Sequence, residues 1–166
     1  MSLDDAAQPA VGEREVCPQA VDEVLTATRA LIAVSTRSLG VLADDVSAAQ
    51  YRMLVVLASR GPKRMVDLAQ LVRVNPSSAG RMCDRLVRKG FIRRHRERTD
   101  RRIVHVVLTG EGRRVVDEVT AARRVMISVM LATLSVAQQQ AAAAALRELS
   151  RAVGEIPDRD WPIPTM

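Results

Sequence analysis

Residues 75–112 constrain the fold more than any other part of the chain, because a helix with both ends marked is followed by two β-prone runs. Asn75 is a favourable N-cap, and Pro76 suits the first helical position, where its missing N–H costs nothing. Gly90 suits the left-handed residue that ends many helices. Four apolar side chains recur at helical spacing and predict a buried stripe: Ala79, Met82, Leu86 and Val87.

After Gly90 the pattern changes to that of strands. Residues 91–96 and 103–109 are rich in β-prone side chains, and the polar hexapeptide between them can reverse the chain. We therefore expect a β-hairpin directly after the helix. A helix and a hairpin that both carry positive charge fit a DNA groove and its flanking backbone.

Positive charge is concentrated in this same stretch. Residues 81–102 hold ten Arg or Lys and three Asp or Glu, a local excess of +7. The whole chain of 166 residues carries a net charge of +6, so the other 144 residues sum to −1. A charge run is more often only a solvated face, but its coincidence with a capped helix and a hairpin favours a surface that binds a polyanion.

These residues also carry a family resemblance. The run DRRIVHVVLTGEG, residues 100–112, matches the DRR-x5-LT-x2-G signature of MarR-type transcription regulators. Residues 68–94, LAQLVRVNPSSAGRMCDRLVRKGFIRR, resemble the two DNA-reading helices of that family, and the likeness extends from roughly residue 20 to 153. The resemblance implies a homodimeric winged helix-turn-helix repressor of a pseudo-palindromic operator. It also implies a small aromatic or phenolic effector, bound where the dimer helices meet the DNA-reading helices.

We expect a mainly α fold with a small β-hairpin wing. The segments are a flexible tail (1–16), a dimerisation helix (17–46), the winged helix-turn-helix DNA-binding region (47–109), two dimerisation helices (110–156) and a Pro-rich tail (157–166). Capping boxes at residues 47–50 and 135–138 predict two of the helix starts, and Thr109 can cap a third. Residues 63–65 are a candidate edge strand. The next helix, over 66–72, would have Val66, a poor capping residue, at its N-cap.

The predicted DNA-binding residues lie on the helix and in the wing. On the helix they are Asn75, Ser77, Ser78, Arg81, Arg85, Arg88 and Lys89; in the wing they are Arg98, Arg101 and Arg102. The N-terminal part of such a helix meets base edges, so Ser77, Ser78 and Arg81 are candidates for reading sequence, and the later cations for gripping phosphate. Asp100 is either an ordinary turn residue or, as the resemblance implies, a wing-structuring residue paired with Arg102.

Other reactive or aromatic residues have less to support a role. Cys17, at the start of the first helix, is a candidate redox-sensitive thiol. In the cysteine-based sensors of the family that the chain resembles, such a thiol is accompanied by partnering tyrosines, whereas this chain has a single tyrosine, Tyr51. Cys83 is expected at the edge of the apolar stripe, buried and inert. Two histidines, His95 and His105, are too few for a zinc site, so no metal or cofactor is expected. Trp161 belongs either to a frayed tail or to a strap on a partner subunit.

Several protein classes fit the sequence poorly. No Gly-rich phosphate loop, nucleophile elbow or carboxylate pair supports an enzyme. No apolar run approaches the length of a membrane span, and no signal peptide is evident, so we expect a cytoplasmic protein. The remaining rivals to an effector-released repressor are a redox-sensing regulator and a sequence-indifferent architectural DNA-binding protein.

Overall fold

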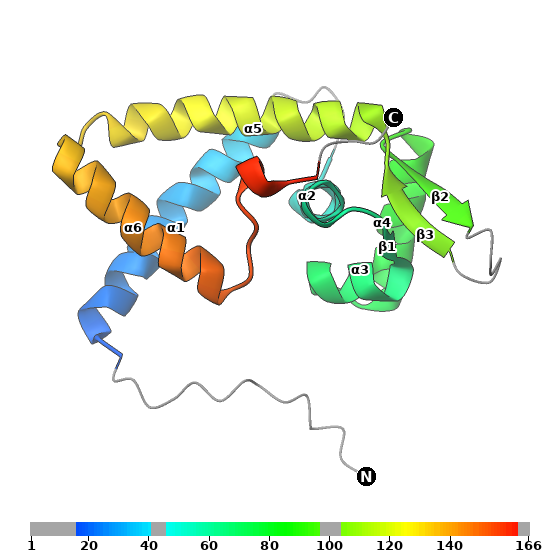
Figure 1. The fold of residues 1–166 in the computed structure, drawn as a ribbon, viewed down its shortest axis with the longest axis horizontal. Coiled ribbons are helices and arrows are strands. Elements are labelled where there is room, and N and C mark those ends of the chain that lie inside the picture. Colours follow the sequence, from blue (N-terminus) through cyan, green and yellow to red (C-terminus); the bar gives the residue numbers. More distant parts are fainter. Residues whose placement is uncertain (1–15, 41–45, 97–103, 163–166) are drawn as a thin grey trace, which may run out of the picture. The chain divides into compact units, whose positions relative to one another are not determined.

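The computed structural model describes residues 16–40, 46–96 and 104–162. Within these ranges the chain is mainly helical with one small sheet (Figure 1). The elements in chain order are α1 (Pro18–Leu39), α2 (Ala48–Arg60), β1 (Lys63–Arg64), α3 (Met65–Val72), α4 (Pro76–Arg88), β2 (Ile92–Arg96), β3 (Val104–Leu108), α5 (Gly110–Leu131), α6 (Val136–Ala152) and a short 3₁₀ helix, η1 (Asp158–Asp160). Of the helices described, none is both long enough and apolar enough to cross a membrane.

The chain divides into two compact units, residues 1–33 and 34–166. In the first unit, residues 18–33 form most of α1, and every one of these side chains is exposed. The second unit contains the last turns of α1 and all the remaining elements. Residues 1–15, most of the expected flexible tail, lie outside the described part.

Local side-chain bonds start the helices where the sequence predicts. Ser47 and Gln50 form a reciprocal capping box on α2, and Ser135 and Gln138 form the same arrangement on α6. Thr109 caps α5 by accepting a hydrogen bond from Gly112 N at 3.0 Å. Each of these bonds satisfies a backbone N–H that has no partner within the helix.

The start of α3 differs from the prediction. Its N-cap is Arg64 rather than Val66, and no side chain caps it. Arg64 is the last residue of β1, and its extended backbone (φ −67°, ψ 153°) leads directly into the helix. The strand therefore supplies the capping conformation, and the helix begins with Met65.

The three strands form an antiparallel sheet in the order β1–β3–β2. The expected hairpin is confirmed: β2 pairs with β3 in a register that places Ile92 opposite Leu108 and His95 opposite His105. The expected edge strand is also confirmed, because Lys63 pairs with Val106. Residues 97–103, which contain the connecting hexapeptide, lie outside the described part.

A single core joins α2, α3, α4, α5 and the sheet. Met53, Leu54, Leu68, Leu86 and Val116 are all fully buried in it. Two details of the predicted stripe on α4 differ. Cys83 lies at the centre of the buried face with no exposed area, whereas Val87 is 36% exposed.

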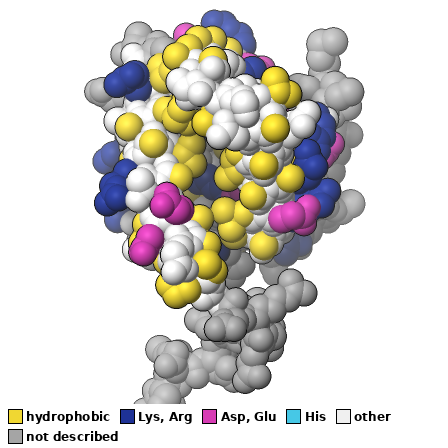
Figure 2. Space-filling view, turned by 90° about the vertical axis from the view of Figure 1, so that its left-hand side faces the viewer, with side chains coloured by type: hydrophobic (Ala, Val, Ile, Leu, Met, Phe, Trp, Pro, Cys, Tyr) yellow, Lys and Arg dark blue, Asp and Glu magenta, His cyan; other side chains and the backbone are white. Residues whose placement is uncertain are grey.

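Apolar side chains remain exposed outside this core. In the second unit, many of them lie on the C-terminal half of α5 and on α6 with its C-cap residue: Val125, Val129, Met130, Val136, Leu146, Leu149 and Val153. Figure 2 views the side on which Figure 1 draws α6, and many of the exposed side chains visible there are hydrophobic. Isolated exposed apolar residues are ordinary, but a run of them along two helices is typical of an interaction surface.

Candidate nucleic-acid interface

Helix α4 presents one exposed polar face and one buried apolar face. Ser77, Arg81, Arg85 and Arg88 recur every three or four residues, and all four are exposed. Ala79, Cys83 and Leu86 face the core at the same spacing and hold the helix in place. Four of the six predicted base-reading and phosphate-gripping residues therefore lie along one exposed face of the helix, while Ser78 and Lys89 are only partly exposed.

The N-terminal end of α4 is held by Asn75. Its side-chain oxygen accepts a hydrogen bond from Ser78 N at 2.8 Å, so only its amide NH₂ group is left to donate to DNA. Pro76 occupies the first turn, as predicted. The arrangement makes Asn75 a structural residue of the helix start in addition to a candidate contact.

Arg81 is oriented by its own helix. Its Nη2 donates to the Ser78 hydroxyl at 3.1 Å, one turn earlier, and the guanidinium group remains exposed. A guanidinium group with several free N–H donors can bond both acceptors of a guanine edge. The role of Arg81 in reading a base stays a prediction.

Cations meet at the C-terminal end of α4. Arg85, Arg88 and Lys89, together with Gln50 of α2, line a shallow hollow of about 440 Å³. The Arg88 Nε donates weakly to the Asp84 carbonyl oxygen at 3.4 Å. Three positive side chains around one hollow could bind a phosphate group of the DNA backbone.

Arg94 is a residue that the sequence analysis missed. It lies on β2, on the same sheet face as buried Ile92, and its Nη2 contacts Asp84 Oδ1 of α4 at 2.5 Å. Asp84 is the only acidic residue of α4, so this pair offsets the one negative charge on the exposed face. Strand alternation could have placed Arg94 toward the helix, but the identity of its partner depends on tertiary packing.

The wing is described as far as its two strands. Arg93, His95 and Arg96 of β2 are exposed on it and add to its positive character. Four predicted residues, Arg98, Asp100, Arg101 and Arg102, lie outside the described part. Their roles, including the pairing of Asp100 with Arg102, stay predictions.

The base of the wing is joined to α5 by two residues of the LT-x2-G run. The Thr109 hydroxyl donates to the Gly90 carbonyl oxygen at 2.7 Å and also caps α5. Gly112 is buried against the Phe91 backbone, where a Cβ atom would collide with the Phe91 carbonyl oxygen. Thr109 and Gly112 thus fasten the end of α4, the wing and the start of α5 together.

A cleft lies away from this face, between α2, α5, α6 and the segment that follows α6. Its volume is about 670 Å³, and the rings of Tyr51 and Trp161 line it together with Arg52 and Arg123. The Arg123 guanidinium group lies 5.2 Å from the Tyr51 ring centroid and donates to the Ser38 hydroxyl at 3.2 Å. Burial raises the pKa of Tyr51, so its hydroxyl stays protonated.

Known proteins are similar to this chain in sequence and in fold. The sequence model of the MarR family matches residues 46–104. The HTH-type transcriptional repressor MdtR of Bacillus subtilis (strain 168) is 32% identical over 109 residues, which are 66% of this chain and 70% of MdtR. The crystal structure of RV1404 from Mycobacterium tuberculosis has 36% identity and a TM-score of 0.79, over 87% of this chain and 98% of that one.

The chain belongs to the MarR family. It is a MarR-family transcriptional regulator with a winged helix-turn-helix fold, in which α3 and α4 are the two helices and β2 and β3 form the wing. A MarR family protein from Bacillus stearothermophilus, at 21% identity, has the same fold with a TM-score of 0.71 over 85% of this chain and 100% of that one. The family consists of transcriptional regulators rather than enzymes.

The cysteines and histidines can now be placed in this MarR fold. Cys83 is buried, its Sγ lies 3.6 Å from Met53 Sδ, and burial raises its pKa to about 11. Cys17 is exposed, and its thiol donates to Gln19 Oε1 at 3.2 Å. His95 and His105 face each other across the wing, and among the described residues no cluster of three metal-binding side chains includes them.

Proposed function

We propose that this chain is a sequence-specific repressor that binds a pseudo-palindromic operator as a homodimer in the cytoplasm. The single observation that carries the proposal is the exposed line of Ser77, Arg81, Arg85 and Arg88 on α4, backed by a rigid apolar face. Side chains so placed can enter a major groove while the wing meets the flanking backbone. MdtR, a relative at 32% identity, is named as a repressor.

Dimerisation would use the exposed apolar side chains of α5 and α6, together with α1. Burial of apolar surface contributes roughly 25 cal/mol per Å². A two-fold axis would let the same surface on each subunit cover the other. Two copies of α4 would then enter successive major grooves about 10 base pairs apart.

The cleft is the candidate site for an effector. Its two rings can stack against an aromatic molecule, and Arg123 can pair with a carboxylate or phenolate. A small aromatic acid or phenol bound there would release DNA only by binding one arrangement of α4 better than another. Trp161 fluorescence, titrated with a panel of aromatic carboxylates and phenols, would report occupancy directly.

A cysteine-based redox switch is the weaker alternative. Cys83 is buried with a raised pKa and is therefore a poor nucleophile, which leaves Cys17. We expect peroxide to leave DNA binding unchanged in both the wild-type protein and Cys17→Ser. A peroxide response that Cys17→Ser abolishes would establish the redox alternative.

Selection from a random pool of duplexes, followed by footprinting, tests the proposed function. A sequence-specific repressor should enrich one short palindrome and protect that palindrome alone. An architectural protein should enrich no motif and coat long DNA evenly. Uniform coating with no enriched motif would contradict the proposal.

A further inference from the structure

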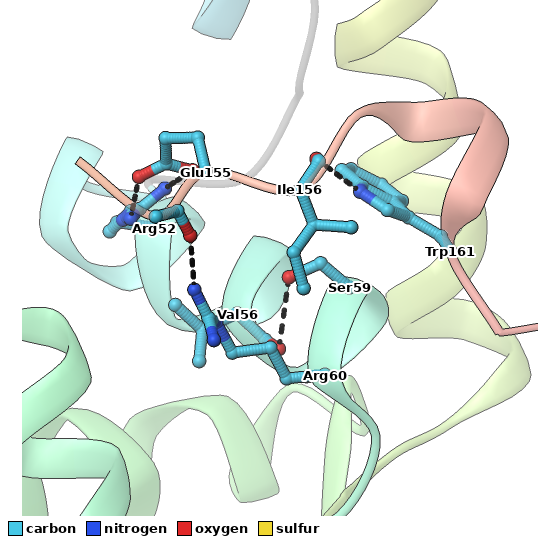
Figure 3. A network of polar contacts seen from close by, with 8 residues as sticks. Arg52, Val56, Ser59, Arg60, Glu155, Ile156 and Trp161 are labelled. Carbon is cyan, nitrogen blue, oxygen red and sulfur yellow. Dashed lines mark hydrogen bonds and ion pairs between the residues drawn. The ribbon is translucent and has the colours of Figure 1, made fainter. Parts of the chain in front are cut away.

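The chain does not end at α6 but turns back across α2. Gly154, with φ 71°, ends the helix, and residues 155–161 pass over α2 toward α5 (Figure 3). Trp161 lies against its own chain, so this end is not a frayed tail, and its contact with a partner subunit stays a prediction. We call the segment from Gly154 to Trp161 the strap.

One end of the strap is attached to α2. Glu155 forms a bidentate ion pair with Arg52, with Arg52 Nη1 to Glu155 Oε2 at 2.9 Å (Figure 3). Arg60, two turns further along α2, donates to the Gly154 carbonyl oxygen. The hydrogen bonds from Arg52 hold the pKa of Glu155 below its usual range. Bidentate geometry is the strongest arrangement that an arginine and a carboxylate can form.

The other end of the strap is attached to α5. The Trp161 indole Nε1 donates to the Ile156 carbonyl oxygen at 2.9 Å, which folds the strap on itself, and the ring packs against the core. The Arg113 guanidinium group of α5 lies 5.7 Å from the ring centroid. Arg124, also on α5, is 3.5 Å from Asp158.

Helix α2 connects the strap to the DNA-reading helix. Met53 follows Arg52 in sequence, is completely buried, and contacts Cys83 of α4 through the 3.6 Å sulfur–sulfur approach. Because protein interiors are densely packed, we expect a shift of α2 to move α4 as well. The strap therefore joins the end of α6 to the element on which α4 rests.

We propose that the strap clamps the end of α6 onto α2 and α5 and so sets the position of α6 relative to α4. The proposal rests on the proposed function, in which α6 meets a partner subunit and α4 meets DNA. In that dimer, the strap transmits the subunit arrangement to the DNA-reading helices. Releasing the strap loosens this link and lowers the affinity for the operator.

The test uses Glu155→Gln, Arg52→Gln and the double variant of the full-length protein. Both side chains are partly exposed, at 44% and 40%, so the fold should survive each change. The control is Glu148→Gln, which removes a more exposed carboxylate (71%) that pairs, among the residues described, with Arg151 on α6 itself. Three quantities are measured: acrylamide quenching of Trp161, amide hydrogen exchange in α2 and α4, and affinity for a duplex that the wild-type protein selects from a random pool.

Trp161 is the only tryptophan, so its quenching reports the strap alone. We expect each single variant to raise the quenching constant, to speed exchange in α2 and α4, and to weaken DNA binding about threefold, the scale of one partly exposed ion pair. The double variant should be no weaker than the singles, because both remove the same interaction. Glu148→Gln should match the wild type.

Two results would overturn the proposal. Unchanged quenching in Glu155→Gln would show that the ion pair does not hold the strap. Increased quenching with unchanged exchange in α4 would show that the strap is not linked to the DNA-reading helix. If the wild-type protein selects no DNA sequence, the proposed function fails, and the quenching and exchange results still decide the role of the strap.

Discussion

At the scale of single residues, Gly112 shows how the family signature serves packing. The α5 backbone at this position lies so close to Phe91 that a Cβ would collide with the Phe91 carbonyl oxygen and lie 2.8 Å from Leu108 Cδ1. Both neighbours belong to the wing or its entry, and one of them is backbone. Glycine is required here by the close approach, not by its backbone angles.

Gly112→Ala should therefore destabilise the protein by about 2–3 kcal/mol, the cost of overpacking a site whose neighbours cannot move freely. Gly110→Ala, two residues earlier in α5, is the matched control because a Cβ there would meet nothing within 4 Å. Denaturant unfolding of the two variants measures the difference. Equal stability of both variants would contradict the packing account.

The two thiols should react at very different rates. Burial raises the pKa of Cys83 to about 11, so at pH 8 its thiol is protonated as well as inaccessible. A thiol reagent should titrate one group in the native protein, lost in Cys17→Ser, and two groups in the wild-type protein in denaturant. Two rapidly reacting thiols in the native protein would contradict the burial of Cys83.

The raised pKa of Cys83 also predicts how the stability of the folded protein changes with pH. The folded-state pKa of Cys83 is higher than its ordinary value of 9.0, so the folded state holds this proton more tightly. Its contribution to stability is present below about pH 9 and is lost as the pH rises toward 11. Cys83→Ala should show a smaller loss of stability between these pH values than the wild-type protein does.

At the scale of helices and strands, the start of a helix could be predicted from the sequence wherever residues close together in the chain form the capping hydrogen bonds. Asn75, Thr109 and the two capping boxes could be predicted because each cap acts within three residues of its helix start. The start of α3 could not be predicted in this way, because the extended backbone of a strand takes the place of a side-chain cap. The Asp84–Arg94 pair and the strap depend on how separate elements pack, which no local pattern contains.

Asn75→Ala should cost about 1 kcal/mol of stability, because the N–H of Ser78 would lose its hydrogen-bond acceptor. Ser77→Ala is the control: that side chain is exposed, so its loss should change the free energy of unfolding little. Thermal unfolding in the absence of DNA separates this structural role from any DNA contact. An Asn75→Ala protein as stable as Ser77→Ala would contradict the capping role.

At the scale of the whole molecule, the exposed apolar side chains of α5 and α6 determine the expected assembly. Leu146 and Leu149 on α6 are 51% and 49% exposed in the single chain. If a partner covers this helix, a charge placed there would be buried without a partner of its own. We therefore expect Leu149→Glu to raise the dimer dissociation constant by more than about tenfold.

Analytical ultracentrifugation at micromolar concentration measures the dimer dissociation constants of Leu149→Glu and the wild-type protein. Glu148→Gln, at the neighbouring position, should leave the dimer intact because its side chain is 71% exposed and, in the described part of the chain, pairs with Arg151 of its own helix. A Leu149→Glu protein that remains as dimeric as the wild type would remove this part of α6 from the interface. The strap would then connect α2 to a helix that meets no partner.

The central claim is that α4 reads DNA sequence through Arg81. The most direct measurement compares Arg81→Ala with Arg29→Ala, which removes one positive charge from α1, for binding to a selected operator and to random duplex at several salt concentrations. Loss of a bidentate base contact should cost about 1–3 kcal/mol on the operator and narrow the gap between operator and random DNA, whereas Arg29→Ala should leave that gap unchanged. An unchanged ratio of operator to random affinity in Arg81→Ala would contradict the account.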